Sequence, residues 1–181
     1  MHRLLSLLAA VVAVSANCPN YEQYARERHE PFSEGKYSFP SQRPSKACRT
    51  YSAPSVEHVI YEEMTEAIGD PDLYQLFQNT WPNTVDTTVR WRGVSADDPE
   101  EELAFITTGD INAMWLRDSA NQLQSYKSII SPLAPPWDGN TISSLFRGAI
   151  NLQARYIRNA PFCNAFHPPP EANLPHAKRS L

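Results

Sequence analysis

The sequence predicts a mainly α-helical fold in which helices pair as antiparallel hairpins, with a small β-hairpin inserted between them. Apolar residues recur every three or four positions in several segments after residue 55. One stretch between those segments is instead rich in β-branched and aromatic residues. We find no internal sequence repeat, and the pattern is compatible with part of a helical toroid.

The first predicted helical hairpin occupies residues 56–81. Residues 56–68 repeat apolar side chains at spacings of three and four, and Ser55 can cap the start of this helix. A second helix begins at Asp70-Pro71, because Asp is a favoured cap and Pro is tolerated in the first turn. Its apolar stripe is predicted to consist of Leu73, Leu76 and Phe77. The short connection between the two helices predicts an antiparallel pair.

A β-hairpin is predicted to follow this helical pair. Val85 to Trp91 and Leu103 to Thr107 are short runs of apolar and β-branched residues that suit strands. Residues 93–102 between them carry five acidic side chains. These side chains lack the regular ligand spacing of a calcium loop, so a solvated turn is favoured over a calcium site.

Two further helices are predicted in the second half of the chain. Leu116 to Ile130 is mostly helical, and another helix runs from about Ile142 to Arg158 with Thr141 as its cap. Prolines at positions 132, 135 and 136 separate the two helices. The inner face of the last helix is predicted to contain Ile142, Leu145, Phe146, Ala149, Ile150, Tyr156 and Ile157.

Composition limits which binding partners and which cellular compartment can be expected for the chain. The 181 residues carry a formal net charge of −4 and no basic patch, which argues against a nucleic-acid partner. Residues 1–16 have the features of a signal peptide, in which Arg3 precedes an apolar stretch of eleven residues. A buried N-terminal helix is the alternative. No later apolar stretch is long enough to span a membrane. We therefore expect a secreted protein or one in the lumen of the secretory pathway.

Proline content divides the chain into segments. Most of the 16 prolines lie before residue 55 or after residue 130. After the signal peptide, residues 17–54 are predicted to be irregular, residues 55–166 to hold the helices, and residues 167–181 to form an irregular, Pro-rich tail.

Polar side chains that suit a sugar are concentrated in residues 105–126. Two carboxylates, Asp110 and Asp118, lie with Arg117 and Trp115 among apolar neighbours. Charged groups rarely sit among apolar residues unless they are paired or face a polar cavity. An indole can stack on the C–H face of a sugar ring while charged groups and amides bind its hydroxyls. This segment is therefore the candidate binding site.

The start of the following helix decides which of these side chains share a cavity. Ser119-Ala-Asn-Gln122 has the pattern of a capping box, which predicts a helix that begins after Ser119 and a loop over residues 109–118. Trp115 and Arg117 can line one cavity only in such a loop, because a helix would separate them by about 200°.

The run Thr-Gly-Asp-Ile-Asn-Ala-Met-Trp-Leu-Arg-Asp-Ser at residues 108–119 resembles the signature of glycoside hydrolase family 125. Residues 43–50, 76–89 and 161–166 resemble family segments in the family order, so the resemblance covers about residues 43–166. It implies an exo-acting α-1,6-mannosidase that takes an α-mannoside glycan as substrate and inverts the anomeric centre without a required metal or cofactor. It also implies an (α/α)6 barrel of six helical hairpins, of which this chain would hold the N-terminal portion.

The length of the chain bears on where the catalytic groups lie. Twelve helices of ordinary length with short connections need roughly 200 residues at least, so the resemblance implies a truncated protein with both catalytic carboxylates beyond Leu181. Asp110 and Asp118 are poor substitutes, because eight residues of helix rise about 12 Å and an inverting pair is ~6.5–9.5 Å apart. Arg117 would also lower the pKa of an adjacent Asp118. No catalytic residue is assigned within this chain.

The resemblance instead predicts a substrate-binding role for the central segment. We expect Asp110, Arg117 and Asp118 to bind hydroxyls of the non-reducing sugar, with Trp115 as a ring platform or cavity wall. Three alternatives stay open. Trp115 can be a core residue, Arg117 and Asp118 can form an internal ion pair that orders the loop, and Asp110 can be only a helix cap.

The three cysteines, Cys18, Cys48 and Cys163, match no zinc-binding spacing. In an oxidising compartment two of them can pair. We expect Cys48 to pair with Cys163, because both lie inside the region that the resemblance covers.

Two functions compete at this point. One is the N-terminal part of an inverting exo-α-mannosidase, inactive by itself. The other is a secreted, non-enzymatic sugar-binding or degenerate protein. Hydrolysis and calorimetric binding assays with α-1,6-mannobiose distinguish them.

Overall fold

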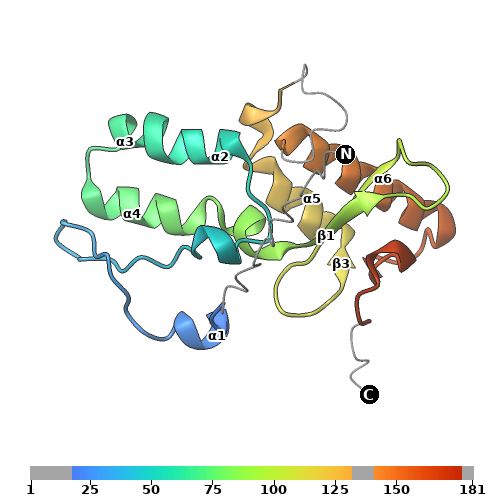
Figure 1. The fold of residues 1–181 in the computed structure, drawn as a ribbon, viewed down its shortest axis with the longest axis horizontal. Helices are drawn as coiled ribbons and strands as arrows, with labels where there is room; N and C mark the ends of the chain where they lie inside the picture. The colour runs from blue at the N-terminus through green and yellow to red at the C-terminus, as the bar shows by residue number, and fades with distance from the viewer. Residues whose placement is uncertain (1–17, 132–140, 177–181) are drawn as a thin grey trace, which may run out of the picture.

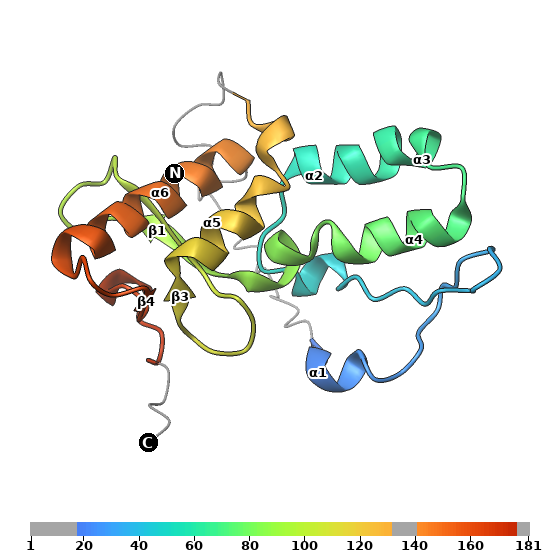
Figure 2. The same cartoon turned by 180° about the vertical axis from the view of Figure 1, so that it is seen from behind.

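The computed structural model describes residues 18–131 and 141–176, which fold into a mainly helical molecule with two small sheets (Figures 1 and 2). The predicted signal peptide over residues 1–16 and the prolines at 132, 135 and 136 lie outside the described residues. A helical hairpin occupies one side of the molecule, and a β-hairpin with the last two long helices occupies the other (Figure 1). None of the helices within the described residues is long and apolar enough to cross a bilayer.

The first long helix is interrupted by a wider turn. It consists of α2 (Pro54–His58), a π-helical segment (Val59–Glu63) and α3 (Met64–Ala67). Its cap is Ala53 and no side chain caps it, so the predicted role of Ser55 is wrong. Pro54 instead occupies the first helical position, which suits a residue without an N–H donor.

Helix α4 (Pro71–Thr80) returns antiparallel to this first helix, which confirms the predicted hairpin (Figure 1). The predicted cap is also correct, since the Asp70 side chain accepts a hydrogen bond from the Leu73 N–H at 2.9 Å. Across the hairpin, the Tyr74 hydroxyl donates to the Ile60 carbonyl at 2.9 Å. That bond satisfies a carbonyl in the π-helical segment, where the regular hydrogen-bond ladder is interrupted.

Helix α4 buries a polar face, and of its predicted apolar stripe only Phe77 packs against the main core. Leu73 and Leu76 are 54% and 44% exposed, whereas Asp72 and Gln75 are buried. The reason is the N-terminal segment, which runs along this face. Asp72 accepts hydrogen bonds from the Ser33 hydroxyl and, at 2.7 Å, from the Tyr37 N–H. The predicted apolar stripe of Leu73, Leu76 and Phe77 is therefore wrong for the two leucines, whereas Phe77 does pack against the main core.

The N-terminal segment itself has little regular structure, as predicted. It contains α1 (Tyr21–Tyr24) and a 3-10 turn (Lys46–Cys48). Asn79, two turns farther along the same face of α4, also holds this segment, because its side chain accepts from the Gln42 N–H at 2.8 Å and donates to the Pro40 carbonyl at 2.9 Å.

Strands β1 (Val89–Val94) and β2 (Glu102–Ile106) form the predicted antiparallel hairpin. The first strand begins later than expected, because residues Thr84–Thr88 form a π-helical turn. A second small sheet pairs β3 (Met114–Trp115) with β4 (Ala165–Phe166), again antiparallel. This pairing places a segment from the end of the described chain beside the start of α5.

Helices α5 (Leu116–Gln124) and α6 (Ile142–Asn159) complete the fold, with 3-10 turns at Lys127–Ile129 and Pro170–Ala172. The Thr141 cap of α6 is confirmed, since its hydroxyl accepts from the Ser144 N–H at 3.1 Å. Helix α6 packs across β2 and buries Ile142, Leu145 and Ala149. Ile150 and Ile157 are 62% and 49% exposed, so the predicted inner face is wrong at these two positions. The main core combines side chains from both halves of the molecule, namely Tyr51, Ala53, Val56, Ile60, Val85, Val89, Ala104, Ile106, Leu123, Tyr126, Ile142, Leu145 and Ala149.

Gly148 marks the closest approach of α6 to the sheet. A Cβ at this position would lie 2.8 Å from the carbonyl carbon of Leu103 and 2.9 Å from the nitrogen of Ala104. Both atoms belong to the backbone of β2, so neither can move aside as a side-chain end would. The missing side chain is therefore what lets this helix and strand touch.

The substitution Gly148→Ala is expected to lower the free energy of unfolding by about 1–3 kcal/mol, because overpacking at the backbone outweighs the gain in helix propensity. Chemical denaturation of the chain measures this change. Ile150→Ala, on the same helix at a side chain that is 62% exposed, is the control and should change stability by only about 0.5 kcal/mol. Equal stability of Gly148→Ala and the unmodified chain would contradict the close contact.

Candidate functional site

Residues 108–119 leave β2 as an exposed loop, pass through β3 and enter α5. Two hydrogen bonds hold the loop at Gly109, whose carbonyl accepts from the Thr107 hydroxyl at 3.1 Å and from Arg90 at 3.2 Å. The next residue, Asp110, is exposed. The structure therefore presents the first part of this segment at the surface and buries Ala113 and Met114.

Asp110 and Gly109 line a cleft of about 520 Å³. The other walls come from residues 18–20, from Cys48 and Thr50, and from the turn that contains Asp86 and Thr88. The Asp110 carboxylate has no hydrogen-bond or ion-pair partner within residues 18–131 and 141–176, so it is available to a ligand. The role of Asp110 in binding a sugar hydroxyl stays a prediction. It caps no helix, because α5 begins only at Leu116.

The inner wall of this cleft is fixed by a buried ion pair. The Asp86 side chain is 1% exposed and accepts from the Arg43 Nε at 2.7 Å, with the Arg49 Nε at 3.7 Å. Glu57 accepts from Arg43 at 2.6 Å and from Arg49 at 2.9 Å. These four side chains, Arg43, Arg49, Glu57 and Asp86, are called the arginine cluster below. Two guanidinium and two carboxylate groups balance its charge.

Burial and pairing act in opposite directions on the acids of the arginine cluster. Burial alone would raise the pKa of the Glu57 carboxyl, but hydrogen bonds and charge from Arg43, with help from Arg49, hold it below its usual value. For Asp86 burial prevails and raises the pKa, although Arg43 and Arg49 oppose this. Burial would lower the pKa of Arg43, but its two acidic partners keep it above the usual value. The Asp86 carboxylate is therefore engaged in an internal ion pair with Arg43 and Arg49.

Sequence reasoning did not find the arginine cluster. Arg43, Arg49 and Asp86 all lie in the two flanking segments that carried the resemblance, residues 43–50 and 76–89. The resemblance of these two segments to the family was the available signal, because the residues around Arg43 and Arg49 are themselves mostly polar. The partners are too far apart in the sequence for local spacing to reveal them.

The other predicted binding residues lie farther along the segment. Trp115 is half-buried in β3 and faces Ala165 in the second sheet. Arg117 is 84% exposed, and its guanidinium is 3.7 Å from the Asp118 carboxylate, whose side chain is 40% exposed. This is an exposed ion pair, so the alternative of an internal pair that orders the loop is wrong. The cleft at Asp110 does not include Trp115, Arg117 or Asp118 among its lining residues.

The predicted capping box is also wrong. Ser119 lies inside α5, buried, and its hydroxyl donates to the Trp115 carbonyl at 2.8 Å. Gln122 uses its amide to donate to the Thr107 carbonyl at 3.3 Å, which ties α5 to the end of β2. The helix therefore begins at Leu116, because the β3–β4 pairing holds Trp115 extended immediately before it.

The structure pairs Cys48 with Cys18, so the predicted Cys48–Cys163 disulfide is wrong. Cys163 is an exposed free cysteine beyond the end of α6. The Cys18–Cys48 bond lies in the wall of the cleft at Asp110 and attaches the N-terminal segment there. Among the residues that the structure describes, no three His, Cys, Asp or Glu side chains are grouped so that they could hold a metal ion.

The arginine cluster predicts a pH-dependent stability. The folded pKa of Glu57 lies below its usual value, so its contribution is present at neutral pH and disappears as the pH falls through that folded pKa. Glu57→Gln should therefore lower the free energy of unfolding by about 1–3 kcal/mol at pH 7, and the difference should shrink in acid. Denaturation at several pH values measures this. Glu66→Gln, on the exposed face of α3, is the control, and a deficit that persists undiminished in acid would contradict the assignment.

Comparison with known proteins identifies the family. Residues 70–181 match the family described as metal-independent alpha-mannosidase (GH125). This match reaches residue 181 and so includes the Pro-rich tail, which we expected to lie outside the resemblance. The chain is also 42% identical over 157 residues to the Meiotically up-regulated gene 157 protein of Schizosaccharomyces pombe. That alignment covers 87% of this chain and 29% of the relative, so the chain spans less than a third of the relative's length. The chain belongs to the GH125 family of metal-independent alpha-mannosidases.

Proposed function

We propose that this chain is the N-terminal part of an inverting exo-α-1,6-mannosidase and that residues 108–119 form one edge of its pocket for the non-reducing mannose. The observation that carries this proposal is the position of Asp110. Within a segment that matches the alpha-mannosidase family, its carboxylate has no partner among the described residues and lines a cleft.

The chemistry of that cleft suits a hydroxylated ring. Asp110 offers carboxylate oxygens that accept from sugar hydroxyls. Arg90 also lines the cleft and, besides the N–H that it donates to the Gly109 carbonyl, has further N–H donors. Thr50 and Thr88 use their hydroxyl hydrogens on backbone carbonyls, at 2.9 and 2.7 Å, which leaves their oxygens as acceptors. Trp115, Arg117 and Asp118 do not line this cleft, so their predicted sugar contacts are a separate part of the proposal.

The cleft lacks a pair of carboxylates that could work as acid and base. An inverting enzyme needs two such groups about 6.5–9.5 Å apart, one of which keeps its proton and one of which activates water. Asp86, the second carboxylate of this cleft, is held by two guanidinium groups. We therefore place both catalytic carboxylates in polypeptide that corresponds to the remainder of the fission-yeast relative.

Exposed apolar side chains support the further proposal that these helices form part of an (α/α)6 toroid. Leu73 and Leu76 on α4 are about half exposed, as are Ile150 and Ile157 on α6. In a toroid such faces pack against neighbouring hairpins. The Cys18–Cys48 disulfide supports the proposal of a secreted or luminal destination, because disulfides persist in oxidising compartments.

The 181-residue chain is expected to release no mannose from α-1,6-mannobiose, since it lacks the acid and base. A coupled assay for free mannose measures this over a day of incubation. Turnover that survives repurification would place the catalytic pair inside this chain and contradict the proposal.

Binding of α-1,6-mannobiose near Asp110 is expected to weaken by about 10–100-fold in Asp110→Ala, which corresponds to the loss of one charged hydrogen bond. Chemical shifts of amides near Gly109 and Thr88, followed by NMR during titration, report on this cleft alone. Asp97→Ala, at the exposed hairpin tip, is the control. Unchanged affinity in Asp110→Ala would remove Asp110 from the pocket. If the 181-residue chain folds stably by itself and binds the disaccharide tightly without hydrolysing it, this result would favour a non-enzymatic sugar-binding protein.

A further inference from the structure

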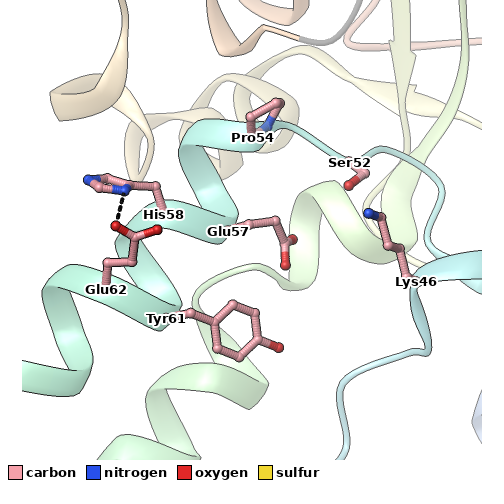
Figure 3. Close-up of a pocket in the computed structure, with 7 residues that line it drawn as sticks. All are labelled: Lys46, Ser52, Pro54, Glu57, His58, Tyr61 and Glu62. Atoms are coloured by element: carbon pink, nitrogen blue, oxygen red, sulfur yellow. Dashed lines mark ion pairs between the residues drawn. The ribbon is translucent and has the colours of Figure 1, made fainter.

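A second cleft lies on the other side of the arginine cluster. It has a volume of about 610 Å³ and lies between the first long helix and the segment that carries Lys46 and Ser52 (Figure 3). Glu57 lines this cleft, whereas Asp86 lines the cleft at Asp110. The arginine cluster therefore separates two distinct clefts, and the second contains none of residues 108–119.

Tyr61 gives the second cleft an aromatic surface that is both exposed and held in place. Its side chain is 51% exposed. The phenolic oxygen accepts from Arg43 at 3.4 Å, and the Arg43 guanidinium carbon lies 5.9 Å from the ring centroid. A ring that is already positioned loses little conformational entropy when a ligand stacks on it.

Unused polar groups converge beside this ring. Figure 3 shows Ser52, Lys46 and Glu57 directed toward one another across the cleft. The Ser52 hydroxyl and the Lys46 ammonium have no hydrogen-bond or ion-pair partner among residues 18–131 and 141–176. Both can donate to a ligand.

Glu57 supplies an acceptor with one position left. Its Oε1 accepts from Arg43 at 2.6 Å and from Arg49 at 2.9 Å, while its Oε2 accepts only from Arg43 at 3.2 Å. A carboxylate has about four lone-pair sites, so Oε2 can take one more hydrogen bond. The two guanidinium groups fix the direction of that free site.

The charge balance of the cleft selects the class of ligand. The arginine cluster is neutral as a unit, and His58 lies 3.1 Å from the Glu62 carboxylate. The single unpaired cation is Lys46, and the carboxylates of Glu57 and Glu62 oppose an anion there. The cleft thus offers hydrogen-bond donors, an acceptor and an aromatic face, and it carries no strong net charge. This combination suits a neutral polyhydroxylated ring.

We propose that the second cleft binds a neutral hexose unit of a glycan, which stacks on Tyr61, accepts hydrogen bonds from Ser52 and Lys46 and donates one to Glu57. This site is separate from the pocket at Asp110 and contains no catalytic residue. It would bind one sugar unit of a glycan while another unit of the same glycan occupies the cleft at Asp110. The inference does not depend on the proposed mannosidase activity.

NMR titration of the whole chain with methyl α-mannopyranoside tests this site. We expect saturable shifts at the amides of Ser52 and Tyr61. Tyr61→Ala should weaken them at least tenfold, and Tyr61→Phe, which keeps the ring, should bind within a few-fold of the unmodified chain. Tyr37→Ala, at another exposed tyrosine, is the matched control. Ser52→Ala is a second test of the site, and it leaves the first long helix unchanged because Ser52 precedes that helix. Thermal melting of each variant verifies its fold.

Inorganic phosphate is the discriminating probe. It should shift these amides less than the sugar does, and saturation by phosphate in preference to the sugar would overturn the proposal in favour of an anion site. Unchanged sugar shifts in a folded Tyr61→Ala variant would also overturn it. Asp110→Ala should leave these shifts intact, so failure of one site is distinguishable from failure of the other.

Discussion

The buried pair between Arg43 and Asp86 is the contact on which the rest of the structure depends. It joins the irregular N-terminal segment to the turn that precedes β1, and Glu57 extends it to the first long helix. Removal of one partner of such a pair leaves an uncompensated buried charge, which typically costs about 3–5 kcal/mol. A segment with little helix or strand of its own therefore acquires a fixed course across the molecule, and both clefts have walls that belong to this cluster.

This arrangement explains how a small, mainly helical chain can hold polar clefts beside an apolar core. The Cys18–Cys48 disulfide and the arginine cluster fix the N-terminal segment at two places around the cleft at Asp110. Asp110 itself stays unpaired at the rim, where a ligand can reach it. Binding groups are thus available in this chain while the acid and base of the proposed reaction come from elsewhere.

Local signals in the sequence predicted the helix caps at Asp70 and Thr141 correctly, but failed at Ser55, because Pro54 takes the first helical position there. The candidate segment 108–119 was found from its own residues, and the structure exposes the first part of it. The Ser119 capping box failed because Trp115 is held extended by a strand from the far end of the described chain. The buried side of α4 was misassigned because Asp72 finds its partners in the N-terminal segment, more than 30 positions earlier. Polar groups that pair over long distances in the sequence leave no periodic pattern in it. The arginine cluster could therefore not be predicted from local spacing either.

A crystal structure of the chain with an unhydrolysable 1-thio-α-1,6-mannobioside tests the central claim most directly. The account predicts that the non-reducing ring lies in the cleft beside Gly109 and that a ring hydroxyl donates to the Asp110 carboxylate. Electron density for the sugar at a place that leaves Asp110 in contact with water alone would contradict the assignment of residues 108–119 to a mannose pocket.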